Sequence, residues 1–256
     1  MIKRQLHPHP IKLPKDLVLP TYPPAFKQNF SHIPGQASII RFFDPDSDSD
    51  YQAMKDIVTG KQSQIWMDES RHLPRSEYYD WAATSTNDSF LFAVHNAAST
   101  TDEELAYVQG FVYIYSEREE KFRVKRMEKK GFLIPNQPHR HALEVSFAVR
   151  PKREDQTQQG SGLMSSALRQ SCFQVKKLIN PTRQSDIQLF GFVDPQNSPA
   201  QRTLIASGFL KKGAMRYDSD SEDISYLYLL SWRKLMEKTT IKLREAIADQ
   251  TLSRMV

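Results

Sequence analysis

A strand, a glycine-bearing turn and a helix follow one another between Ala142 and Leu178, and this succession constrains the fold more than any other feature. The strand is Ala142 to Val149, which Arg150-Pro151 ends. Apolar residues at helical spacing then predict a helix up to Leu178: Leu163, Ala167, Leu168, Val175 and Leu178. Because the first N–H groups of a helix have no partner within it and its dipole favours negative charge there, the turn Gln159-Gly160-Ser161-Gly162 predicts an anion site.

Glycines at 160 and 162 allow close approach of the backbone to a ligand, and Lys152 and Arg153 add long-range attraction. Two glycines with one residue between them are also typical of a plain helix start. The turn alone therefore indicates an anion, and the rest of the chain must identify it.

The remaining pattern predicts an α/β (α+β) domain in which helices flank a central sheet of about seven strands. Strands are indicated by runs of β-branched and aromatic residues. They are expected at 37–43, 89–95, 107–115, 142–149, 187–193, 209–217 and 224–232, with the second and third forming a hairpin. Helices are expected at about 51–58, after Pro74, at 160–178 and at 199–206, where Gly208 provides the C-terminal stop.

Three segments lie outside this core. Residues 1–36 form a proline-rich N-terminal arm, because repeated prolines favour extended or turning backbone. Residues 117–140 form a charged insertion into the domain at 37–232, interpreted either as a lid or as a solvated connection. Residues 233–256 predict a C-terminal helix, which docks on its own domain or on a second copy in a homodimer.

Composition limits the class of protein. The single cysteine, Cys172, excludes an intramolecular disulfide and cysteine-based zinc sites. No apolar run approaches the roughly 20 residues that span a bilayer, so a soluble, cytoplasmic protein is expected. The net charge of +5, from 35 basic and 30 acidic residues, fits an anionic partner such as a phosphate-rich cofactor.

The motifs combine into a more specific pattern. Val149-x-Pro151 leads into the Gly160-x-Gly162 turn, and Asn197-x-x-Ala200 and Gly208-Phe209 follow at fixed spacings. This series resembles the acyl-CoA core of the GNAT superfamily of N-acetyltransferases. The resemblance covers residues 37 to 232, with specific motifs between 142 and 209. The sequence departs from the family pattern in two places. Thr157 stands where the family has glutamine or arginine, in a loop after Pro151 that is about three residues longer than usual. Leu204 stands where the family has a tyrosine.

The resemblance implies a mixed, mostly antiparallel sheet that splays between its fourth and fifth strands. It implies acetyl-CoA, or another acyl-CoA, as co-substrate. The pantetheine arm would pair with the backbone of Phe147, Ala148 and Val149. The pyrophosphate would lie on the backbone of residues Gln159 to Leu163, while Asn197 and Ala200 line the cleft. From the residues themselves, Asn197 before Pro199 is also typical of a helix N-cap.

Acyl transfer to an amine needs a group that removes a proton. Glu144 is the first candidate base, and His141, whose imidazole titrates near neutrality, is the second. A surface or salt-bridged glutamate is the alternative interpretation of Glu144. Tyr217 or Tyr226 are candidates for the acid. His139 and His141 lack a third ligand, so no metal is expected.

Two functions follow. The first is an enzyme that acylates a primary amine, on a small molecule or a protein, within a ternary complex; the acidic loop Asp218 to Asp223 could attract such an amine. The second is a non-catalytic acyl-CoA-binding module, which the apolar Leu204 favours. A nucleic-acid partner is not expected, because the basic residues around Lys121 to Lys130 alternate with acidic ones.

Overall fold

One eight-stranded sheet organises the protein. The computed structural model describes residues 27–33, 36–60, 73–84, 89–96, 108–115, 120–133, 141–150, 162–178, 187–216 and 223–239. The strands lie in the order β1-β2-β3-β4-β5-β6-β8-β7, and every neighbouring pair is antiparallel except β5 and β6. They are β1 Lys27–Ile33, β2 Gln36–Phe42, β3 Ser89–Asn96, β4 Val108–Tyr115, β5 His141–Val149, β6 Ile187–Val193, β7 Phe209–Arg216 and β8 Ile224–Leu230. The predicted mixed, mostly antiparallel sheet is thus confirmed.

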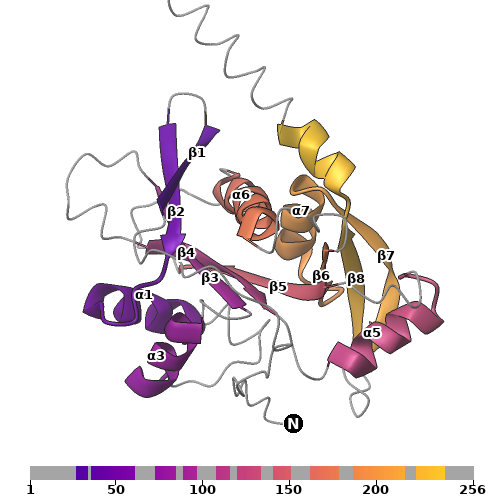
Figure 1. Cartoon of the computed structure of the whole chain (residues 1–256), viewed down its shortest axis with the longest axis horizontal. Helices are drawn as coiled ribbons and strands as arrows, with labels where there is room; N and C mark the ends of the chain where they lie inside the picture. Colours follow the sequence, from indigo (N-terminus) through magenta and orange to yellow (C-terminus); the bar gives the residue numbers. More distant parts are fainter. Residues whose placement is uncertain are drawn as a thin grey trace, which may run out of the picture.

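Helices cover both faces of this sheet (Figure 1). On one face lie α6 (Leu163–Leu178) and α7 (Ser198–Ala206). On the other face lie α1 (Asp48–Val58) and α3 (Arg75–Thr84), with α5 (Glu120–Lys129) further along the sheet beside β7 and β8. Residues 232–239 form a further helical segment. None of the helices in the described ranges is long and apolar enough to cross a membrane.

The alternation of side chains along the strands divides the core. Leu143 and Val145 of β5 pack with α6 residues such as Leu168 in the largest apolar cluster. On the opposite face, Ala148 packs near the cluster under α1 and α3, and Ala142 belongs to the cluster under α5. The helices α1 and α3 and the helix α5 therefore cover different parts of the same face.

The sheet has one strand that the sequence assigned to the N-terminal arm. Residues Lys27–Ile33 form β1 and pair with β2 along its length. No proline occurs between Pro24 and Pro34, so this stretch keeps all its N–H groups for a strand ladder. Pro34-Gly35, a dipeptide typical of turns, separates the two strands. Residues 1–26 of the arm lie outside the described residues.

The described part of the charged insertion is neither a lid nor a solvated connection. Residues Glu120–Lys129 form α5, and Met127 (0% exposed) and Leu133 (3% exposed) are buried against the sheet. Both belong to one apolar cluster with Phe190, Leu227 and Leu229. Apolar side chains in this segment recur at three-residue spacings, and these are sufficient to give α5 one buried side. The high charge of the sequence concealed this spacing.

A buried ion pair fixes α1 to the sheet. Asp50 is 0% exposed, and its two carboxylate oxygens each accept a hydrogen bond of 2.6 Å from the Arg41 guanidinium. The backbone N–H of Asp44 donates to the same carboxylate at 2.9 Å. All three bonds end on one carboxylate at the first turn of α1, where the helix dipole also favours negative charge, and charge strengthens the two bonds from Arg41.

We expect Asp50→Asn to lower the free energy of unfolding by about 3 kcal/mol, because the substitution leaves the Arg41 guanidinium without its counter-charge. Urea denaturation measures this change. Asp46→Asn is the matched control, since Asp46 lies exposed in the same loop and should change stability little. Equal losses in the two variants would contradict the assigned role of the ion pair.

Candidate functional site

The parallel strands β5 and β6 separate half-way along β5. They pair only from His141 opposite Ile187 to Glu144 opposite Phe190. From Glu144 to Val149, β5 continues to pair with β4 on its other side, while β6 pairs with β8 from Phe190 to Val193. Among the described strands, the backbone edge of β5 that faces β6 therefore has no partner beyond Glu144. This is the splay expected between the strands at 142 and 187.

The open part of β5 contains the three predicted pantetheine-binding residues, Phe147, Ala148 and Val149. The side chain of Val149 is 51% exposed, although valine favours burial and its strand is central in the sheet. The backbone of Arg150, just beyond, donates to Gln109 O at 2.7 Å, so the strand is held on its β4 side. An unpaired strand edge offers N–H and C=O groups to an extended ligand.

Gly110 brings the start of α6 close to this edge. It lies on β4 opposite Val149, and a Cβ atom at this position would be 2.5 Å from Ala148 O and 2.7 Å from Met164 Cε. Met164 belongs to the first turn of α6. Only glycine therefore permits the first turn of α6 to pack directly on the ends of β4 and β5.

The N-terminus of α6 is the predicted anion site. Gly162 has φ +79°, which favours glycine, and its carbonyl accepts the first helical hydrogen bond from Ser166 N at 3.0 Å. Leu163 and Met164 are buried, so the apolar side of the first turn is fixed against the core. Gln159, Gly160 and Ser161 lie outside the described residues, as does Thr157, and their anion-binding role stays a prediction.

Asn197 is the N-cap of α7, beside the end of β6. Its Oδ1 accepts a hydrogen bond of 3.1 Å from Ala200 N, and Pro199 occupies the first turn. Within the described part of the chain, the Asn197 amide nitrogen has no hydrogen-bond partner. The same side chain can therefore cap the helix and donate to a ligand in the splay.

Glu144 lies where the strands divide. It is only 4% exposed, and it pairs with Tyr115 of β4 on one side and Phe190 of β6 on the other. Its neighbours Leu143 and Val145 pack toward α6, so its side chain is on the opposite face. On that face it lies between the part that α1 and α3 cover and the part that α5 covers. The interpretation of Glu144 as a surface glutamate is wrong.

Two tyrosines were missed as members of the site. Tyr113 and Tyr115 of β4 are opposite Ser146 and Glu144, and their rings stack with centroids 4.6 Å apart. The signal was present in the sequence, because alternation in Tyr107 to Tyr115 puts Tyr113 and Tyr115 on one face. Only the strand register, which the sequence does not give, brings that face to Glu144.

Leu204 occupies the position of the family tyrosine. It is 1% exposed, and its Cδ1 lies 3.6 Å from the Cβ position of Gly191, which in turn lies 3.4 Å from Val145 O. An apolar side chain thus lies at the narrow end of the splay. One helical turn earlier, Gln201 accepts a hydrogen bond of 3.2 Å from the hydroxyl of Tyr228. Burial, with a smaller effect of Tyr226, raises the pKa of Tyr228.

Among the other catalytic candidates, only Tyr226 has a described side chain, and it lies on the opposite face of the sheet from Glu144. His141 begins β5, three residues before the splay, and its side chain lies outside the described residues, as do His139 and Tyr217. Tyr226 is on the α7 side of the sheet, where Lys211 Nζ lies 3.0 Å from its ring centroid. No group of three or more metal-ligating side chains occurs among the described residues.

Comparison with known proteins gives similarity of structure and not of sequence. No protein-family model matches the chain, and no curated protein matches it. Among solved structures, ribosomal-protein-S5-alanine acetyltransferase from Vibrio fischeri is 17% identical, with a TM-score of 0.51, covering 80% of this chain and 95% of that one. RimJ of Mycobacterium smegmatis in complex with CoA-disulfide is 12% identical, with a TM-score of 0.51, covering 79% and 85%.

A third structure, AAC(6')-Ib in complex with paromomycin and acetyl-CoA, is 10% identical, with a TM-score of 0.51, covering 78% of this chain and 96% of that one. All three are acetyltransferases, and the parallel β5–β6 pair with its splay fits the same fold. The chain has the GNAT fold. Similarity at these low sequence identities establishes the GNAT fold, but it does not identify the acceptor or the reacting residues.

Proposed function

We propose that the chain is an N-acyltransferase that moves an acetyl, or another acyl, group from acyl-CoA to a primary amine in the cytoplasm. One observation supports this most directly. The unpaired edge of β5 beyond Glu144 runs beside the first turn of α6 and the capped start of α7. RimJ and AAC(6')-Ib, which share the fold, were solved with CoA compounds.

The described residues fit acyl-CoA. The backbone of Phe147, Ala148 and Val149 would pair with the amides of the pantetheine arm, as an added strand does. The N–H groups that open α6 would hold the pyrophosphate, with Gly162 allowing close approach. The Asn197 amide would donate to a pantetheine carbonyl. Bound acyl-CoA supplies a thioester carbonyl that an amine can attack.

Glu144 is the proposed base. Its carboxylate takes a proton from the ammonium group of the acceptor, either directly or through a water molecule. The neutral nitrogen then forms a bond to the thioester carbonyl carbon, and the carbon–sulfur bond breaks. The sulfur leaves as a thiolate, and the nitrogen releases to solvent the extra proton that it carries after the attack. The thiolate takes up a proton from solvent, since Leu204 cannot donate one. Tyr113 and Tyr115 flank Glu144 on the face from which the amine would approach.

A second function follows from Leu204. A buried leucine at the narrow end of the splay cannot protonate sulfur, and a module that binds acyl-CoA without turnover needs no such group. The two functions share the acyl-CoA site and differ only in whether thiol is released.

Donor binding is tested with two glycines that have the same conformation. Gly162 and Gly131 are both exposed, with φ +79° and +71°, so aspartate at either position has a similar backbone strain of about 1–2 kcal/mol. Acetyl-CoA at 100 times its Kd should stabilise the wild type and Gly131→Asp by about 2.7 kcal/mol. Gly162→Asp should lose most of this stabilisation, because its carboxylate repels the pyrophosphate. Thermal melting with and without acetyl-CoA measures the difference.

Turnover is tested by release of free thiol from acetyl-CoA against a panel of amines that includes aminoglycosides, polyamines and peptides with free N-termini. Stabilisation without release for any amine would favour the binding module. Absence of stabilisation in the wild type, or its equal loss in both aspartate variants, would overturn the acyl-CoA site itself.

A further inference from the structure

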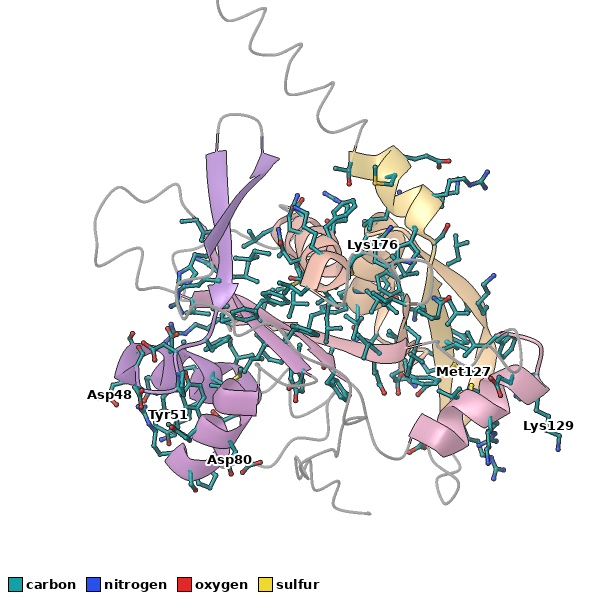
Figure 2. The ribbon with its side chains drawn as sticks, viewed as in Figure 1. Asp48, Tyr51, Asp80, Met127, Lys129 and Lys176 are labelled. Carbon is teal, nitrogen blue, oxygen red and sulfur yellow. The ribbon has the colours of Figure 1, made fainter. Side chains whose placement is uncertain are left out.

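The outward side of α5 and the adjoining edge of β7 form a second charged surface, remote from the splay. It consists of Lys125, Lys129, Lys130 and Lys212, all of which are exposed, and is called here the α5–β7 surface. In Figure 2, Lys129 projects away from the protein, whereas Met127 of the same helix faces the sheet. The fold thus gathers basic side chains from two elements more than 80 residues apart, as the hydrogen bond from Lys130 Nζ to Ala214 O illustrates.

Folding separates charges that alternate along the sequence. Met127 and Val124 point inward, and Lys125 and Lys129, four residues apart, share the outward side of α5. Glu128, the one acidic side chain described on this helix, lies at its flank and is half-buried. The mixed charge that argued against an anionic macromolecule is therefore absent from the outward side.

Some basic residues of the protein are already held in ion pairs. Arg41, Arg75 and Arg150 each form an ion pair with an aspartate. Within the described part of the chain, none of the four residues of the α5–β7 surface forms an ion pair. Their charges are available to an external anion.

The surface is also rigid. Phe132, just after α5, packs against Gly213, where a Cβ atom would be 2.7 Å from its ring. Gly213 is at the bulge of β7 opposite β8, and Met127 and Leu133 are buried beneath. The backbone that carries the charges therefore needs no rearrangement when a ligand binds, and only the exposed lysine side chains lose conformational freedom.

We propose that the α5–β7 surface binds nucleic acid through its phosphate backbone. A membrane fits less well, because an amphipathic helix binds lipid by inserting its apolar side, and that side of α5 is buried against the sheet. On the same face, α1 and α3 carry Asp48, Asp56, Glu77 and Asp80, so a polyanion bound to the α5–β7 surface would not extend over those two helices. Binding here does not depend on acyl-CoA.

Edge protection is the competing explanation. Lysines and bulges on an edge strand prevent pairing with other chains, and β7 is an edge of the sheet with both. Edge protection requires charge of either sign, whereas phosphate binding requires positive charge. The two explanations are therefore distinguished by charge reversal.

The experiment measures binding of the full chain to a short fluorescein-labelled single-stranded RNA of mixed sequence, by anisotropy over a range of KCl concentrations. Four phosphate contacts predict a slope of log K against log salt of about −2.8. Lys125→Glu/Lys129→Glu should weaken binding by about 10-fold or more and reduce the slope to about −1.4. Lys177→Glu/Arg202→Glu, with the same change of net charge on exposed residues of α6 and α7, should bind nearly as the wild type does.

Melting curves by circular dichroism check that both double variants are folded. The proposal would be overturned if the wild type did not bind the RNA at low salt, or if the two variants weakened binding equally. It would also be overturned if the protein bound phosphatidylserine vesicles and not RNA, which would assign the α5–β7 surface to a membrane.

Discussion

Replacing Glu144 with glutamine is expected to lower the rate of amine-dependent thiol release by about 100-fold or more, while acetyl-CoA still stabilises the variant. Glutamine keeps the shape of the side chain at a site that is 4% exposed, so the fold should be retained. It cannot accept the proton of an ammonium group. The measurement is thiol release at saturating acetyl-CoA, with the best acceptor from the amine panel.

Glu128→Gln is the matched control, because Glu128 lies on α5, away from the splay, and should leave the rate unchanged. A parallel measurement over pH separates two roles. If Glu144 is the base, the variant should lose the rise in rate that accompanies deprotonation of this group. A rate that falls with an unchanged pH profile would reduce Glu144 to a positioning residue.

Glu144 could be found from the sequence because it lies on a strand whose position the Val149-x-Pro151 boundary indicates. Its surroundings could not be found in this way. Tyr115 and Phe190 come from strands 29 residues before and 46 residues after it, and only the register of the sheet makes them its neighbours. Local pattern gives the face of a residue within its strand, whereas pairing across the sheet depends on long-range packing.

The same limit applies to the order of the strands. The positions of β6, β7 and β8 follow from runs of apolar residues, but the sequence does not say that β8, and not β7, pairs with β6. The insertion is a further case. Its charge predicts exposure, while Met127 and Leu133 show that few apolar residues at the right spacing are enough to bury one side of α5.

The block Asn197-x-x-Ala200 to Gly208-Phe209 has structural reasons that are independent of any ligand. Asn197 caps α7, and Ser207, at the other end of that helix, donates to Thr203 O at 2.7 Å and to Ser165 O at 3.1 Å. Gly208 follows with φ +95°, and its carbonyl accepts from Ser231 N at 3.1 Å. Much of this motif is therefore explained by how α7 begins and ends.

Gly208→Ala is expected to cause a large loss of stability. A Cβ atom there would lie 2.7 Å from Leu235 N and 2.9 Å from Leu235 Cα, both of which are backbone atoms. Strain at positive φ adds about 1–2 kcal/mol, and overpacking adds about 1–3 kcal/mol. The sum of about 3 kcal/mol should lower the Tm by roughly 10 °C in a domain of this size.

Gly213→Ala distinguishes strain at positive φ and a clash with backbone atoms from simple crowding by a side chain. Its Cβ atom would also meet a neighbour at 2.7 Å, but that neighbour is the ring of Phe132, and Gly213 does not have positive φ. The Phe132 ring can rotate away, whereas the backbone of Leu235 can move only if the helical segment at 232–239 undocks from α7. Gly208→Ala should therefore melt well below Gly213→Ala. Similar melting temperatures would mean that this segment is held loosely, and that the glycine is needed only to end α7.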